Sequence, residues 1–430
     1  MRNVCGNHSD TFSLLESWTA VHLLASSPAF KRTDDFKVEA SAEEAISSLL
    51  ARSSDLTTTR NKRGATLLHV ALGHGAHERV VARLVEMGPA ALRLPDKDGH
   101  LPLHYVAAFG GIPWTIVAEM IKIYPLSICI QTLHGDTPLH LLMSNSARFL
   151  NKEMRLDRNT VKIAELLIGS GSKNQPSPFS IKNNEKLNAF HVAALFETPL
   201  QFIKLMMGKK DGKTAALETT ALGSTVLHLL CASDAKDCLA KVEAVATPEA
   251  CVIQDCRGRT PLFVAAENKK LSKKVVKHLL QVCPEAAALP TSTDYLPLHV
   301  AVRGRRSKQS VVKALIKAYP HGVKVVTDRG NTPLHEASKH NAPVSVVKLL
   351  LKKNKNAANQ PNNNHELPID RARGHGASKA IVDLLNQEQQ RQFEKAKKKK
   401  DAKSGDHVSQ GKPEASRFEV DLQSPFFGQC

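Results

Sequence analysis

The chain has 430 residues, of which 42% are hydrophobic but only 5% aromatic, and its 59 Lys and Arg against 41 Asp and Glu give a net charge of +18. The hydrophobic content suffices for a buried core, and its Leu, Ala and Val favour small helix-on-helix contacts over one large globular core. The eight cysteines form no CxxC pair, MRNVCGNHSD lacks a signal-peptide core, and the apolar stretch WTIVAEMIKIYPLSICI contains Glu119, Lys122 and Pro125. We therefore expect an intracellular chain, cytoplasmic or nuclear, that is neither secreted nor membrane-spanning.

Residues 1–60 carry two segments of helical type, TAVHLLASS (19–27) and AEEAISSLLARSS (42–54), separated by the insertion KRTDDFKVEAS. The first contains His22 and echoes a motif that recurs downstream. We interpret 1–60 as a divergent N-terminal capping unit, because its net negative charge suits the polar outer face that such a unit needs.

Residues 61–387 repeat one pattern, and they hold the excess of positive charge. Its forms are RGATLLHVA (63–71), DGHLPLHYVA (98–107), HGDTPLHLL (134–142), EKLNAFHVAA (185–194), LGSTVLHLL (222–230), RGRTPLFVAA (257–266), TDYLPLHVAV (293–302), RGNTPLHEA (329–337) and HELPIDRA (365–372). The anchors are His69, His104, His140, His191, His228, Phe263, His299, His335 and Asp370, at spacings of 35, 36, 51, 37, 35, 36, 36 and 35. The surplus in the third unit divides into two loop insertions, which a repeat array tolerates.

Each repeat predicts a pair of helices. Thr332 can cap the first helix, Pro333 suits its first position, and Leu334 begins the apolar stripe. SVVKLLLK then predicts a second helix with one apolar face. A proline after the second helix, in GPAAL (88–92), YPLSI (124–128), TPEAC (247–251), CPEAA (283–287) and YPHGV (319–323), predicts a helix stop and a longer outer turn.

Over residues 61–385 the chain resembles the ankyrin-repeat family, whose T-P-L-H-x-A signature stands intact as TPLHEA (332–337). The resemblance implies an all-α ankyrin-repeat solenoid of about nine units with short projecting hairpin turns. It also implies that the anchor His bonds to backbone groups between units. A shared metal site is disfavoured, because stacked helices lie about 8–10 Å apart whereas zinc holds nitrogen at about 2 Å.

After the array, AIVDLLNQEQQRQFEKAKKKK runs from an apolar helix into a polar one, so 388–430 is predicted as a helical extension followed, after about residue 401, by a disordered basic and polar tail. The run KAKKKK (395–400) fits a nuclear import signal, a nucleic-acid contact or a solubilising tail.

No catalytic motif is present, and Cys231, Cys238, Cys251, Cys256 and Cys283 are scattered as buried structural thiols would be. We therefore expect no enzyme activity, no cofactor and no metal. The family's concave groove and hairpin tips imply partner-binding residues at matching positions. They are Asp98, His100, Tyr105, Phe109, Trp114, Arg257, Arg259, Lys269, Lys270, Arg303, Arg305, Arg306, Arg329 and Lys339.

The early members of this set are aromatic and the late ones basic, which favours a partner protein with an acidic or acidic-apolar surface. GRRSK (304–308) and NKKLSKK (268–274) fit solvated loops equally well. The sequence thus predicts a monomeric, noncatalytic protein-binding scaffold or adaptor, with a basic scaffold on nucleic acid as the alternative. Reversing Arg303, Arg305 and Arg306 to Glu should weaken binding without unfolding the array.

Overall fold

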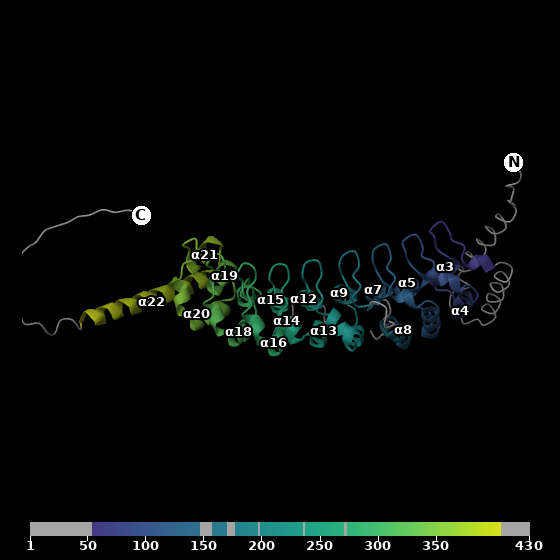
Figure 1. Ribbon diagram of the computed structural model, residues 1–430. Helices are drawn as coiled ribbons and strands as arrows, with labels where there is room; N and C mark the ends of the chain where they lie inside the picture. Colours follow the sequence, from purple (N-terminus) through teal and green to yellow (C-terminus); the bar gives the residue numbers. More distant parts are fainter. Residues whose placement is uncertain are drawn as a thin grey trace, which may run out of the picture.

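The computed structural model describes residues 54–146, 157–169, 177–196, 198–234, 237–270 and 273–405. In Figure 1 these residues form one elongated, gently curved array of helix pairs, with hairpin loops projecting from one side. The described residues contain helices and no strands, which confirms the all-α solenoid. Most of the predicted capping unit and residues 406–430 of the tail lie outside the described residues.

Nine helix pairs follow one another in the described part of the chain. The first helices are α3 (Leu67–His74), α5 (Pro102–Phe109), α7 (Pro138–Asn145), α9 (Ala189–Leu195), α12 (Val226–Ala232), α15 (Pro261–Glu267), α17 (Pro297–Ala301), α19 (Pro333–Lys339) and α21 (Pro368–Gly374). The second helices are α4 (Glu78–Met87), α6 (Trp114–Ile123), α8 (Arg158–Gly169), α10 (Leu200–Met207), α13 (Cys238–Val245), α16 (Lys273–Val282), α18 (Gln309–Ala318), α20 (Val344–Lys353) and α22 (Lys379–Gly405).

A short helical turn follows most second helices, and the predicted prolines begin it. These turns are η3 (Pro89–Arg93), η4 (Pro125–Ile128), α14 (Pro248–Val252), η6 (Pro284–Ala287) and η7 (Pro320–Val323). Proline ends the preceding helix and, lacking an N–H, is well placed to start the next. Without a proline, α11 (Lys210–Ala215) and η8 (Lys355–Asn359) occupy the same place, and η2 (Ser54–Thr57) precedes the first pair.

The start of α19 has the predicted cap. Thr332 is the N-cap, Pro333 is the first helical residue, and the Thr332 hydroxyl accepts a hydrogen bond from the His335 backbone N–H at 3.4 Å. In return, the Thr332 N–H donates to His335 Nδ1 at 3.1 Å. Two amides at the helix start are thereby satisfied, as in a capping box.

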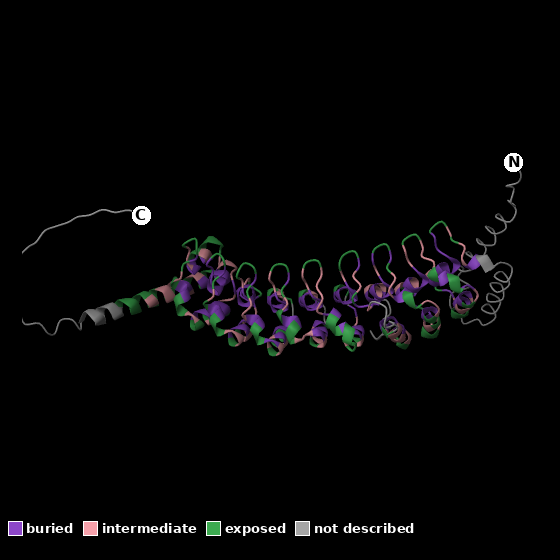
Figure 2. Ribbon diagram, in the orientation of Figure 1, coloured by how far each residue is buried: buried purple, intermediate pink, exposed green. Residues whose placement is uncertain are grey.

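The core is a single apolar cluster that runs from Leu56 to Leu385. Figure 2 shows the buried residues between the two layers of helices and the exposed ones on the hairpins and outer surfaces. In α20, Val346, Val347 and Leu350 are buried while Lys348 and Lys352 are exposed, which confirms the predicted amphipathic face. Each pair packs mainly on its neighbours, so the core extends with every repeat.

Glycine at the hairpin tips lets neighbouring hairpins approach closely. Gly258 has φ +72°, and a Cβ there would lie 2.7 Å from the Ser292 backbone nitrogen. That nitrogen donates to the Arg257 carbonyl at 3.1 Å. Equivalent backbone bonds of 2.9–3.1 Å join most successive hairpins, and they form a row along the projecting side.

The row of backbone hydrogen bonds between hairpins weakens where another residue takes the place of the hairpin glycine. Asp294 adopts φ +57° at the same position, and the following bond, from Asp328 N–H to the Thr293 carbonyl, lengthens to 3.3 Å. After Lys186, with φ +61°, the described hairpins share no such backbone bond; Lys182 Nζ instead donates to the Thr219 carbonyl at 2.8 Å.

The third unit and the last helix depart from the regular repeat. The third unit's extra residues fall between α7 and α8 and after α8, where 147–156 and 170–176 lie outside the described residues. Helix α22 buries Ile381 and Leu385 but leaves Phe393 72% exposed, and it continues to Gly405. No helix in the described ranges is both long and apolar enough to cross a bilayer.

Candidate protein-interaction surface

The anchor histidines join each unit to the hairpin of the next. Nε2 of His335 lies 3.1 Å from the Glu366 carbonyl, and Nε2 of His228 lies 2.8 Å from the Arg259 carbonyl. Because Nδ1 of His335 accepts the Thr332 N–H, the proton of the neutral ring sits on Nε2, where it can be donated to that carbonyl. Both ring nitrogens are therefore committed to backbone groups, which confirms the structural role.

Burial holds these rings neutral. It lowers the pKa of His69, His104, His191 and His299 to about 4, although hydrogen bonds to backbone carbonyls act in the opposite direction. The two non-histidine anchors keep part of the cap: Phe263 N–H donates to Thr260 Oγ1 at 3.2 Å, and Asp370 Oδ2 accepts the Leu367 N–H at 2.9 Å.

Asp98, Arg257 and Arg329 occupy the same hairpin-tip position, one residue before the glycine, in three different units, and all three are exposed. His100 and Arg259 lie two residues further on and are half-buried. The tips therefore present side chains that vary between units on a common backbone.

Arg259 is held by its own hairpin. Asp255 Oδ1 accepts the N–H groups of Arg257 and Arg259 at 2.9 and 2.8 Å, and Asp255 Oδ2 lies 2.8 Å from Arg259 Nε. Burial opposes ionisation of Asp255, but these hydrogen bonds and the Arg259 charge outweigh it and keep its pKa below the ordinary value. Arg259 thus shapes the hairpin, whereas Arg257 points its charge outward from an exposed tip.

The early aromatic residues divide between two elements. Tyr105 and Phe109 lie one turn apart on α5, with ring centroids 5.8 Å apart, and Phe109 is 51% exposed. Tyr105 donates its hydroxyl to Asp96 Oδ2 at 3.0 Å and meets His69 edge-on. Trp114 instead begins the second helix α6, and its backbone N–H donates to Asn159 Oδ1 at 2.6 Å.

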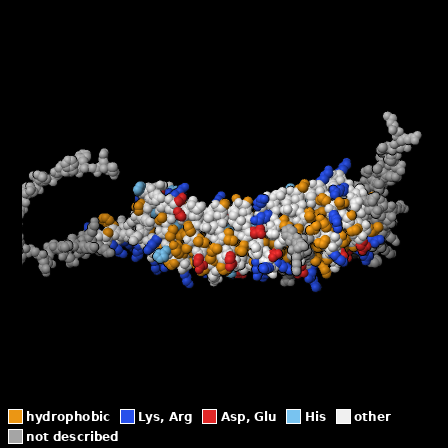
Figure 3. All heavy atoms as spheres, in the orientation of Figure 1, with side chains coloured by type: hydrophobic (Ala, Val, Ile, Leu, Met, Phe, Trp, Pro, Cys, Tyr) orange, Lys and Arg blue, Asp and Glu red, His pale blue; other side chains and the backbone are white. Residues whose placement is uncertain are grey.

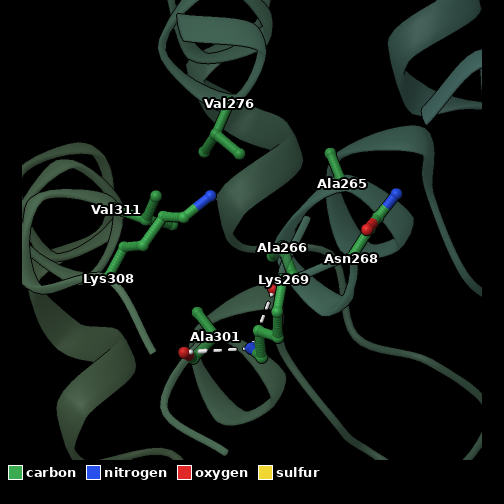
Figure 4. A pocket seen from close by; sticks show the side chains of 8 residues that line it. All are labelled: Ala265, Ala266, Asn268, Lys269, Val276, Ala301, Lys308 and Val311. Carbon is green, nitrogen blue, oxygen red and sulfur yellow. Dashed lines mark hydrogen bonds between the residues drawn. The ribbon is translucent and has the colours of Figure 1, made fainter. Parts of the chain in front are cut away.

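Lys269 does not lie on the open surface that we predicted. Its ammonium donates to the carbonyls of Ala266, Val300 and Ala301 at 3.1, 2.6 and 3.1 Å, and Figure 4 shows it directed at Ala301. Burial lowers its pKa to about 8. The adjoining cavity of about 10 Å³ has room for no more than one water molecule. Lys269 therefore caps the ends of α15 and α17.

Arg303 also belongs to the framework. Its Nε lies 2.8 Å from Oε2 of Glu336, whose side chain is only 2% exposed, and its guanidinium lies 4.6 Å from the centre of the Tyr295 ring. The reversal of Arg303 is therefore a test of stability as well as of binding, contrary to our expectation.

Lys270 pairs with Asp234 of the preceding unit at 2.7 Å, with both side chains exposed.

The remaining predicted cations are more accessible. Arg305 and Arg306 are exposed in the connection between α17 and α18, and Lys339 is half-buried at the end of α19. In the part of the chain that the structure describes, no carboxylate forms an ion pair with Arg257, Arg305, Arg306 or Arg329.

Exposed apolar side chains near the middle of the array were missed. Leu133 and Leu222 are 67% and 68% exposed at hairpin tips, and Leu195 and Phe196, at and just after the end of α9, are 50% and 52% exposed. The signal was the repeat register itself, since Leu222 directly precedes a hairpin glycine.

Among the described residues, the acidic group closest to a metal-binding arrangement is Asp96, Asp98 and His100. Asp96 Oδ1 already accepts the N–H groups of Asp98 and His100 at 3.0 and 2.7 Å, and Oδ2 accepts the Tyr105 hydroxyl. The arrangement is the hydrogen-bonded turn of a hairpin.

Four of the five cysteines that were predicted to be structural are buried. Cys231, Cys238, Cys251 and Cys283 are buried, and burial raises the pKa of Cys238 to about 11 and of Cys251 to about 12, so their thiols stay protonated. Cys256 was expected to be buried with them, but it is exposed at a hairpin tip.

Residues 298–394 match the family described as ankyrin repeats (3 copies). The chain is similar to a solved structure described as the crystal structure of the ankyrin repeat domain of Bcl-3, a unique member of the IkappaB protein family. The two are 22% identical with a TM-score of 0.44, and the alignment covers 59% of this chain and 99% of that one. Among curated proteins, none matches the chain significantly.

The matched segment contains α17 to α21 and much of α22, and the units before it repeat the same helix pairs and, in all but one, the same histidine-to-hairpin bonds. Residues 298–394 are therefore ankyrin repeats, and the described units before them share the same repeat architecture.

Proposed function

We propose that this chain is a noncatalytic scaffold or adaptor that binds a partner protein through its hairpin tips and the exposed side of its first helices. Ankyrin repeats are, in general, protein–protein interaction modules. Stacked repeats offer an extended surface whose tips vary while the framework stays constant. Buried, protonated thiols suit a reducing intracellular compartment.

The observation that carries the proposal is the set of exposed arginines without a carboxylate partner in the described residues: Arg257, Arg305, Arg306 and Arg329. Arginine is enriched in binding hot spots, and unpaired cations steer acidic partners toward a surface. The exposed Leu133 and Leu222 tips and Phe109 add apolar contacts earlier in the array. An acidic surface with apolar side chains is therefore the partner chemistry that we propose.

The proposal is tested by affinity capture with the full chain from nuclease-treated lysate, followed by mass spectrometry. A variant with Arg257→Glu and Arg329→Glu should lose a discrete set of proteins that the wild type retains. Lys204→Glu with Lys213→Glu is the matched control, because it makes the same charge change on α10 and α11.

Proteins retained equally by both variants would contradict binding at the tips. Recovery that disappears after nuclease treatment would instead support the alternative, a basic scaffold on nucleic acid, because phosphate contacts dominate such binding.

A further inference from the structure

The second helices of three consecutive late units carry an unbalanced lysine surface. Lys277, Lys313 and Lys348 each follow a buried Val-Val pair, so they occupy equivalent exposed positions in α16, α18 and α20. Because the valines fix which face is buried, each of these lysines projects from the outer side of its helix.

Most earlier second helices contain acidic as well as basic side chains, and α10 (LQFIKLMM), with Lys204 alone, is the exception. Arg83 lies 3.1 Å from Glu86 in α4, and Lys122 lies 3.4 Å from Glu119 in α6. In contrast, the sequences KKVVKHLLQV, QSVVKALIKA and VSVVKLLLKK of α16, α18 and α20 contain no Asp or Glu. The outer face therefore changes from mixed charge to positive charge along the array.

A groove of about 570 Å³ runs between α16 and α18 on this face. Its apolar floor is formed by Leu280, Ala314 and Ala318. Its basic rim is formed by Lys277, Lys313 and Lys317. In Figure 3 this region of the array shows hydrophobic side chains with both basic and acidic side chains around them. The hairpin tips project from the opposite side of the helix pairs (Figure 1).

One ligand with apolar and acidic side chains can contact both the apolar floor and the basic rim of the groove. An apolar side chain that enters between the helices would cover Leu280, Ala314 and Ala318, and flanking carboxylates would meet the three ammonium groups. The acidic residue that is closest to the groove in sequence is Glu285 in η6. It follows Pro284, which also lines the groove, and it accepts a hydrogen bond from the Cys283 thiol at 3.5 Å. The rim itself keeps its positive charge.

We infer that the groove between α16 and α18 is a second binding surface, which takes an acidic peptide segment with large apolar side chains. Nucleic acid fits less well, because the floor offers nothing to a phosphate backbone and no aromatic side chain lines the groove for base stacking. The inference goes beyond the proposed function, since it uses the outer helices rather than the tips.

The test is fluorescence anisotropy of the full chain with a labelled twelve-residue peptide of Glu and Asp containing two Leu and one Phe. Two further probes are the same peptide with its apolar residues changed to Ser, and a single-stranded DNA oligonucleotide. The apolar-containing peptide should bind at least about tenfold more tightly than the Ser peptide. Lys313→Glu with Lys317→Glu should weaken its binding at least about tenfold.

Ala314→Lys separates the groove from general attraction between charges. It fills the floor while adding a positive charge, so it should weaken binding of the apolar-containing peptide. Arg257→Glu with Arg329→Glu should leave that binding unchanged, which separates this surface from the tips. Circular dichroism establishes that each variant is folded.

Three results would overturn the inference: binding weaker than about 1 mM at low salt, equal affinity for the Ser peptide or the oligonucleotide, or tighter peptide binding by Ala314→Lys.

Discussion

Arg303 and Glu336 are joined across two neighbouring repeats, with Nε and Oε2 2.8 Å apart. Burial would raise the pKa of Glu336, but the charge and hydrogen bond of Arg303 outweigh it, and the net pKa lies below the ordinary value. The pair therefore keeps a buried carboxylate ionised at the contact between α17 and α19.

Arg303→Ala should lower the free energy of unfolding by about 1–3 kcal/mol. Breaking a buried ion pair costs about 3–5 kcal/mol, and the partial exposure of Arg303 reduces that figure. Urea denaturation followed by circular dichroism measures the change. Adding Glu336→Gln should recover part of the loss, because the unpaired charge is removed. An Arg303→Ala variant as stable as the wild type would show that the ion pair contributes nothing to the free energy of unfolding.

His335→Ala should lower the melting temperature, because it removes the acceptor of the Thr332 N–H and the donor to the Glu366 carbonyl. Buried groups left without partners cost about 1–3 kcal/mol each. His321→Ala is the matched control, since His321 is exposed in η7. Equal melting of the two variants would contradict the structural role of the anchor.

The array should lose stability as the pH falls from about 6.5 to about 4. In this range the unfolded chain protonates its anchor histidines near the ordinary pKa of 6.5, whereas His69, His104, His191 and His299 in the folded chain have a pKa of about 4. The unfolded state therefore binds more protons, and full stability is restored above pH 6.5. Each histidine contributes up to about 1.4 kcal/mol per pH unit.

Chemical denaturation at a series of pH values measures this slope. His299→Phe copies the side chain found at the Phe263 anchor, and it should make the slope shallower by one histidine's share. A slope that is unaffected by this variant would contradict the assignment.

Gly258→Ala should destabilise the array by about 1–3 kcal/mol, through its positive φ and the close approach of Ser292. Gly111→Ala separates the two causes, because Gly111 has φ +81° but no atom within 4 Å of an added Cβ. Urea denaturation should therefore show the larger loss for Gly258→Ala. Equal losses would mean that the contact between hairpins adds nothing to the backbone strain.

The repeat register predicted the fold well because its signals are local. Thr332, Pro333 and His335 define one helix start within four residues, and a proline after five of the second helices marks the outer turn. Periodic copies of such signals specify a stack without knowledge of any long-range contact.

The surroundings of some candidate side chains could not be predicted, because residues of other units engage them. Lys269 and Arg303 looked like exposed loop cations, but their partners, Val300 and Glu336, lie 31 and 33 residues away. Residue type and loop position do not reveal such pairings. The partner-binding role of the other selected residues stays a prediction.

The interruption after Lys186 divides the row of hairpin bonds into an earlier and a later segment. Within each segment, a shift of one hairpin strains the backbone bond to the next, so the hairpins move together. At the interruption the connection passes through side chains: Lys182 Nζ donates to the Thr219 carbonyl, and His191 Nε2 lies 3.1 Å from the Glu218 carbonyl. Between α9 and α12 the hairpins are therefore joined through side chains alone, so a partner that contacts hairpins on both sides would add a direct link that the backbone does not supply there.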